Sequence, residues 1–176
     1  MYTTLSVDQV VVIAGFGPAR VSQPRRQMIA GTSVNGFDLE LYCGTRGGYW
    51  VSSEHVSKKY QDGTFRDLTT PAVVTRALQI LVKNRERQNR NANQRARKLH
   101  QRATSNDFVE MVTCLRDVYA TNDKEYSTTY LNLFEKLLDQ VAVEIALVYG
   151  IPRQGIRGQL ESTIRNREIT PELHQP

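Results

Sequence analysis

Hydrophobic and polar positions change their period about one third of the way along the chain. In the first third, apolar residues form short β-branched runs or alternate with polar residues, which is typical of half-buried strands. Val10–Ile13 is such a run, and the segment Phe37–Leu41 alternates strictly. Both segments are therefore predicted to be strands.

Turn signals rich in glycine separate further strand candidates. Ala19–Ser22, Arg25–Ile29 and Tyr49–Ser52 are short segments bounded by such signals. Asn35-Gly36 is a residue pair typical of a two-residue hairpin turn. Short strands at this spacing predict a small N-terminal β barrel of the SH3 or Tudor type.

Beyond residue 69 the apolar residues recur every three or four positions, which predicts helices. Thr70 and Pro71 supply an N-cap and a first helical residue, and Ser105–Asp107 offers another cap. Ser127 is expected to cap a long helix, which Gly150 ends. The pattern predicts a compact bundle of four to five helices.

The fold class predicted from these patterns is α+β, with two domains in sequence. The β domain is expected to span residues 1–62 and the helical domain residues 70–168, with a linker at 63–69 and a frayed tail at 169–176. A short last helix is expected over 158–167.

Positive charge is concentrated in the segment Lys83–Arg102. It holds eight lysines and arginines with Glu86 as its only acid, whereas the whole chain has a formal net charge of +5. The apolar stripe of this segment at helical spacing consists of Ala92, Ala96, Leu99 and Ala103, and the opposing polar stripe of Asn91, Arg95, Lys98 and Arg102. Such a helix can dock by one face and present a phosphate-binding surface with the other. A merely solvated, charge-rich face is the alternative.

No arrangement of residues typical of an enzyme or a metal site is found in the sequence. Cys43 and Cys114 are far apart in the sequence, and two thiols are too few for a structural zinc site. His55, His100 and His174 stand alone, without a neighbouring set of ligands. We therefore expect a protein that is not an enzyme and has no cofactor or metal.

No targeting or membrane segment is expected. No apolar stretch approaches the length of a membrane span, and the N-terminal residues show no basic region followed by an apolar run. These observations favour a cytoplasmic protein that does not contact a membrane.

Two stretches of the helical half carry a resemblance to a known family. They are ATSNDFVEMVTCLRDVY and, after a polar break, LNLFEKLLDQVAVEIALVYG. They resemble the helical C-terminal domain of the CarD/CdnL family, bacterial transcription regulators that bind RNA polymerase. Cys114–Val118 stands where this family reads Val-Arg-Asp-Leu at the end of a helical stripe.

The N-terminal half is similar to the same family in the order of its segments. Val10–Val12, Gly17–Val21, Ile29–Gly31 and Tyr49–Ser52 follow the order of the family's Tudor-like polymerase-interacting domain. Phe65–Leu68 falls where the family enters its first helix. The resemblance covers about residues 7–167.

This resemblance implies two partners, the RNA polymerase β subunit and promoter DNA. In the family, the β domain docks on a lobe of the β subunit through an exposed strand edge. The helical domain contacts DNA near the transcription bubble and modulates the stability of the open complex. A nucleoid-associated protein, monomeric when free, is expected.

By position in the family, two groups of residues would make these contacts. The residues expected at the polymerase are Gln27, Met28, Ile29, Trp50 and Val51. The residues expected at DNA are Arg87, Arg90, Asn91, Arg95, Arg97, Lys98 and Arg102.

The sequence departs from the family at the DNA fork. Familiar members place a tryptophan just before the basic helix as a wedge, whereas Ala92 or Asn91 stands there in this chain. Two alternative functions remain: a free-standing, sequence-nonspecific DNA- or RNA-binding protein, and a protein-interaction adaptor without nucleic-acid contact.

Overall fold

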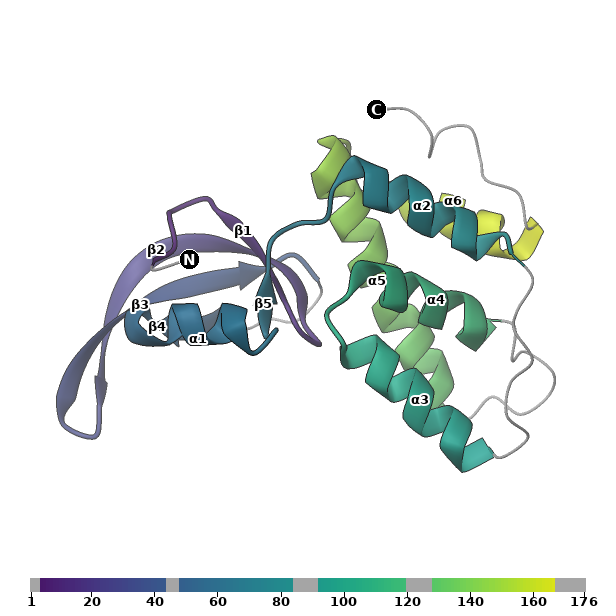
Figure 1. Ribbon diagram of the computed structural model, residues 1–176. Coiled ribbons are helices and arrows are strands. Elements are labelled where there is room, and N and C mark those ends of the chain that lie inside the picture. The colour runs from purple at the N-terminus through teal and green to yellow at the C-terminus, as the bar shows by residue number, and fades with distance from the viewer. Residues whose placement is uncertain (1–3, 44–47, 84–91, 120–127, 167–176) are drawn as a thin grey trace. The chain divides into compact units, whose positions relative to one another are not determined.

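The computed structural model describes residues 4–43, 48–83, 92–119 and 128–166. The chain divides into a β unit, Met1–Leu68, and a helical unit, Thr69–Pro176 (Figure 1). The predicted α+β organisation with two domains agrees with this division.

The β unit is a five-stranded antiparallel sheet in the order β4-β3-β2-β1-β5. Its strands are β1 (Val10–Ile13), β2 (Gly17–Ile29), β3 (Thr32–Leu41), β4 (Gly48–Ser52) and β5 (Phe65–Arg66). A 3₁₀ turn, η1 (Ser53–His55), and a short helix, α1 (Val56–Gln61), follow β4. Because β4 and β5 are edges that do not pair with each other in the described residues, the sheet is open and the predicted SH3/Tudor barrel is not confirmed.

Strand β5 lies inside the segment expected to be a linker. Phe65 pairs with Ile13 of β1 and is 1% exposed, and the Ala14 amide donates to the Thr64 carbonyl at 2.8 Å. Phe65 and Arg66, expected in a linker that leads to the first helix of the helical domain, are thus a strand of the sheet. The apolar ring of Phe65 is buried in the core of the β unit, together with Val56 of α1, rather than opening the helical unit.

Strands β2 and β3 form one long ribbon (Figure 1). The two predicted strands at 19–22 and 25–29 are a single strand with an irregularity between Val21 and Gln23. The hairpin turn lies at Ala30 and Gly31, which have φ values of 48° and 80°. Both central residues of a type I′ turn need positive φ, so this pair satisfies its requirement.

The predicted turn at Asn35-Gly36 is wrong, because both residues lie inside β3. Gly36 pairs with Arg25 on one side and with Ser52 on the other. A Cβ atom at Gly36 would lie 2.4 Å from Cζ2 of Trp50. The glycine is thus required by the close approach of the indole ring, not by a turn.

The helical unit contains five helices in its described residues, in agreement with the predicted four to five. They are α2 (Pro71–Leu81), α3 (Ala92–Thr104), α4 (Phe108–Tyr119), α5 (Thr128–Tyr149) and α6 (Ile156–Asn166). Helix α4 lies between α2 and α3, and the long α5 packs behind it (Figure 1). The apolar stripe of α4 fills the centre of the core, with Val112, Leu115 and Val118 fully buried.

Side-chain caps begin two of these helices. Thr70 Oγ1 accepts from the Val73 amide at 3.4 Å, as predicted for the start of α2. Asp107 Oδ1 accepts from the Glu110 amide at 2.9 Å, which confirms a cap in the segment 105–107. This hydrogen bond satisfies one of the free amides in the first turn of α4, as an N-cap side chain does.

The long helix α5 ends as its sequence predicts. Gly150 adopts φ 64°, and the Ile151 amide donates to the Ala146 carbonyl at 3.0 Å. This is the six-residue hydrogen bond of a Schellman ending, which favours glycine in the left-handed position. The expected cap at Ser127 lies outside the described residues.

Candidate nucleic-acid interface

Helix α3 is the basic helix of the chain. Between Ala92 and Thr104 it carries four arginines or lysines and no acid. Leu99 and Ala103 are buried at 3% and 6% exposure, as their apolar stripe predicts, and Arg97 and Lys98 are exposed. A helix with this arrangement can bind phosphates through side chains that do not contribute to its packing.

Several of the residues predicted to bind DNA lie wholly or partly outside the described part of the chain. Arg87, Arg90 and Asn91 lie outside the described residues. Arg95 lies on α3, but its side chain is outside the part of the chain that the structure describes. The described basic surface of α3 therefore consists of Arg97 and Lys98.

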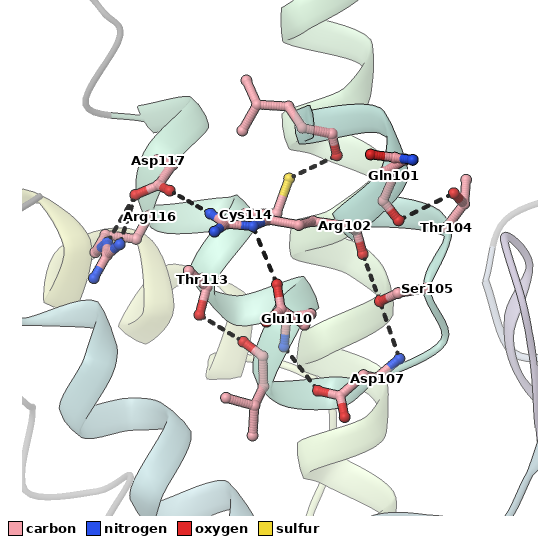
Figure 2. A network of polar contacts seen from close by, with 12 residues as sticks. Gln101, Arg102, Thr104, Ser105, Asp107, Glu110, Thr113, Cys114, Arg116 and Asp117 are labelled. Atoms are coloured by element: carbon pink, nitrogen blue, oxygen red, sulfur yellow. Dashed lines mark hydrogen bonds and ion pairs between the residues drawn. The ribbon is translucent and has the colours of Figure 1, made fainter. Parts of the chain in front are cut away.

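Arg102 differs from the outward orientation expected from its spacing. Its Nε lies 3.1 Å from Oε2 of Glu110, and its Nη1 donates to Oδ2 of Asp117 at 3.0 Å (Figure 2). The guanidinium is thus turned onto α4 and neutralised by two carboxylates. Its spacing on α3 could not reveal these partners, because both belong to another helix.

Asp117 is held from its other side by Arg116. Both Nε and Nη2 of Arg116 donate to Oδ1 of Asp117, at 2.9 and 2.7 Å. The side chains of Arg116 and Asp117 are only 10% and 7% exposed. Removing one partner of such a buried pair leaves an uncompensated charge, which costs about 3–5 kcal/mol.

The three residues of α4 that bind α3 lie on one stripe. Glu110, Cys114 and Asp117 are spaced i, i+4, i+7, so they share a helix face. The Cys114 thiol donates to the Leu99 carbonyl at 3.3 Å, between the two carboxylates that hold Arg102 (Figure 2). The spacing of Glu110, Cys114 and Asp117 is a signal in the sequence that could have revealed this polar stripe on a mostly apolar helix.

Cys114 is unreactive in this position. Burial raises the pKa of its thiol from 9.0 to about 12, and the nearby Asp117 carboxylate acts in the same direction. A buried thiol with a raised pKa has much less of the nucleophilic, metal-binding thiolate than an ordinary cysteine. Its role is to pack and to donate one hydrogen bond.

The residues predicted to contact polymerase divide into two groups. Gln27, Met28 and Ile29 lie together at the end of β2, next to the hairpin turn. Met28 and Ile29 are 69% and 46% exposed. The ribbon therefore ends in two apolar side chains that remain largely exposed among the described residues.

Trp50 and Val51 lie on the edge strand β4, where one main-chain edge is unpaired. The Val51 side chain is 4% exposed and belongs to the core, so it does not face a partner. The Trp50 ring is half-buried over Gly36, and its buried Nε1 has no hydrogen-bond partner. Trp50 therefore packs as an aromatic residue of the β unit in this structure.

Neither a cluster of metal ligands nor a membrane-spanning helix is found in the described residues. No group of three or more potential metal ligands lies together in them. None of their helices combines the length and the hydropathy needed to cross a membrane.

Comparison with known proteins assigns the helical unit. Residues 76–161 match the family model described as the CarD C-terminal domain. This match supports membership of the CarD/CdnL family. The match includes α3, α4 and α5 with the ion-pair network between α3 and α4, and it does not extend to the β unit. No curated protein matches the chain.

Membership of the CarD family defines the general class of function. The family consists of transcription regulators that interact with RNA polymerase and are not enzymes. The CarD C-terminal domain in this chain accordingly indicates a CarD-like transcription factor.

Proposed function

We propose that this CarD-like regulator binds the RNA polymerase β subunit through its β unit and contacts promoter DNA near the transcription bubble through α3, thereby modulating the stability of the open complex. The observation that carries the DNA contact is the basic surface of α3. Arg97 and Lys98 are exposed on a helix without acids, while Leu99 anchors the same turn in the core.

The contact proposed with polymerase rests on the β2–β3 ribbon. In the described part of the chain, its distal part has no neighbouring strand on either side: β1 ends opposite Arg20, and β4 ends opposite Gly36. Unpaired main-chain groups beside the exposed Met28 and Ile29 suit the addition of a partner's strand, with apolar side chains providing specificity. The proposal leaves Val51 out of this contact, since its side chain fills the core.

The DNA contact proposed here is electrostatic. The helical unit contains no tryptophan, because Trp50 is the only one in the chain. The proposal therefore includes no tryptophan wedge at the fork, and Ala92 marks the position where it would stand. Arg102 is also left out of the phosphate contacts, because two carboxylates already neutralise it.

One experiment with two variants of the full chain tests both contacts. Co-purification with polymerase, promoter open-complex lifetime and DNA affinity as a function of salt are measured for each. The Met28→Asp variant should lose co-purification, whereas Val7→Asp, which changes another exposed apolar residue of the β unit, should retain it.

The second variant combines Arg97→Gln with Lys98→Gln. It should keep co-purification but lower the slope of log affinity against log salt by about 1.8, since each lost phosphate contact removes about 0.9. Arg76→Gln removes an exposed charge from α2, on the other side of α4, and should leave the slope unchanged. An unchanged slope in the double variant overturns the assignment of α3 to DNA. DNA binding without co-purification would instead favour a free-standing nucleic-acid binder.

A further inference from the structure

The described residues of α3 hold the helix on α4 through a small set of contacts. In the described part of this 13-residue helix, Leu99 and Ala103 are the buried apolar residues, and α4 is its main packing partner. Isolated helices of this length are marginal in water, so tertiary contacts have to hold it. Whatever fixes α3 on α4 also fixes the direction in which Arg97 and Lys98 point.

The carboxylate of Asp117 binds an arginine from each of the two helices. Asp117 accepts Arg102 of α3 on Oδ2 and Arg116 of its own helix on Oδ1 (Figure 2). The double hydrogen bond from Arg116 fixes the rotamer of the carboxylate, because two donors of a rigid fork reach the same oxygen. Asp117 is thereby pre-oriented to receive Arg102.

The corner between the helices adds a second point of attachment to the same arginine. Glu110 belongs to the capped first turn of α4 and lies 3.1 Å from Arg102. Ser105 Oγ donates to the Arg102 carbonyl at 2.8 Å and accepts from the Asp107 amide at 3.3 Å. The backbone and the side chain of Arg102 are therefore both held.

We propose that Asp117 is a positioning residue for DNA binding: through Arg102 it holds α3 in the orientation that presents Arg97 and Lys98 to phosphates. This inference rests on the proposed DNA contact of α3. The cluster of Arg102, Glu110, Arg116 and Asp117 carries two positive and two negative charges, so its net effect on a polyanion at a distance is small.

The direction in which one substitution changes DNA affinity separates a positioning role from an electrostatic role. Asp117→Asn removes a negative charge, and a purely electrostatic role predicts tighter DNA binding. Positioning predicts the opposite, a loss of affinity of about tenfold with an unchanged salt slope, because the phosphate contacts keep their number but lose their alignment. Glu161→Gln removes an acid of α6 that is ion-paired with Arg157 of the same helix, and it serves as the control for the loss of one negative charge. Tighter or unchanged binding by Asp117→Asn overturns the proposal.

Hydrogen exchange of the full chain tests positioning without DNA. In Asp117→Asn, the amides of residues 97–104 should exchange faster, while those of residues 137–146 in the core of α5 keep their protection. Equal acceleration of both segments would mean that Asp117 only supports overall stability, and it overturns the proposal. If the wild type does not bind DNA but acceleration is confined to α3, the DNA contact fails and the positioning of α3 stands.

A second variant covers the case in which Asp117→Asn does not fold. Glu110→Gln removes the other ion pair of Arg102, and its side chain is 46% exposed, so the fold should tolerate the change. It should show the same two effects at smaller size, faster exchange confined to residues 97–104 and weaker DNA binding. Wild-type exchange and affinity in this variant overturn the proposal.

Discussion

The Gly36→Ala substitution should destabilise the β unit, although it adds only one methyl group to a strand. The added Cβ would lie 2.4 Å from Cζ2 of Trp50 and 2.4 Å from the carbonyl oxygen of Val51. Neither contact can be kept, and the second involves the backbone of β4, which cannot turn away as a side chain can. Overpacking of this kind costs about 1–3 kcal/mol, and the backbone contact favours the upper half of that range.

The chain provides its own probe and control for this measurement. Trp50 is the only tryptophan, so its fluorescence during urea or thermal unfolding reports on the β unit. A loss of about 2 kcal/mol corresponds to a fall in melting temperature of about 8–16 °C for a unit of this size. Gly48→Ala lies in the same strand pair, and its nearest neighbour would be the Leu39 carbonyl at an ordinary 3.7 Å. Equal stability of the two variants would refute the steric reasoning.

Two further predictions concern the helical unit. In the native chain at pH 8, iodoacetamide should label Cys43 and leave Cys114 unlabelled until urea is added, because Cys114 is fully buried with its thiol pKa raised to about 12. Above pH 9.0 the Cys114 thiol loses its proton in the unfolded chain but keeps it in the folded chain. The free energy of unfolding should therefore fall by about 1.4 kcal/mol for each further pH unit. The Cys114→Ala variant should lack this pH dependence. Leu115→Ala should lower the free energy of unfolding by about 2–5 kcal/mol, as measured by urea unfolding followed by circular dichroism. Leu131 is exposed, so Leu131→Ala should lower it by less than about 0.5 kcal/mol. Similar losses in the two variants would contradict the central position of α4.

Local signals in the sequence predict the helical unit well. The Thr70-Pro71 start, the Asp107 cap and the Gly150 ending each act within one turn of helix, and all three appear where the sequence predicts them. The apolar stripe of α4 is equally local, because helical periodicity alone selects its buried face. Such features depend on residues that are close in sequence, so they can be predicted without knowledge of the fold.

The misjudged features depend on residues distant in sequence. Asn35-Gly36 has the composition of a turn, but pairing with β4 and the ring of Trp50 decide its place. Arg102 has the spacing of the basic stripe, but Glu110 and Asp117 on α4 decide where its charge points. The two-residue strand at Phe65 is too short to show a hydrophobic period in the sequence. It forms because β1 offers an edge with which it can pair.

The small strand β5 has a consequence for synthesis and for the choice of fragments. Since β1 gains its outer neighbour only when residues 65–66 are available, the sheet remains one strand short on the ribosome until nearly the whole β unit has emerged. Chains fold from the N-terminus during translation, so an incomplete sheet exposes β1 as a bare edge for that interval. A fragment that stops at residue 62, where composition places the domain boundary, would remain in that state permanently and lack the buried ring of Phe65. Fragments of the β unit should therefore extend through Leu68.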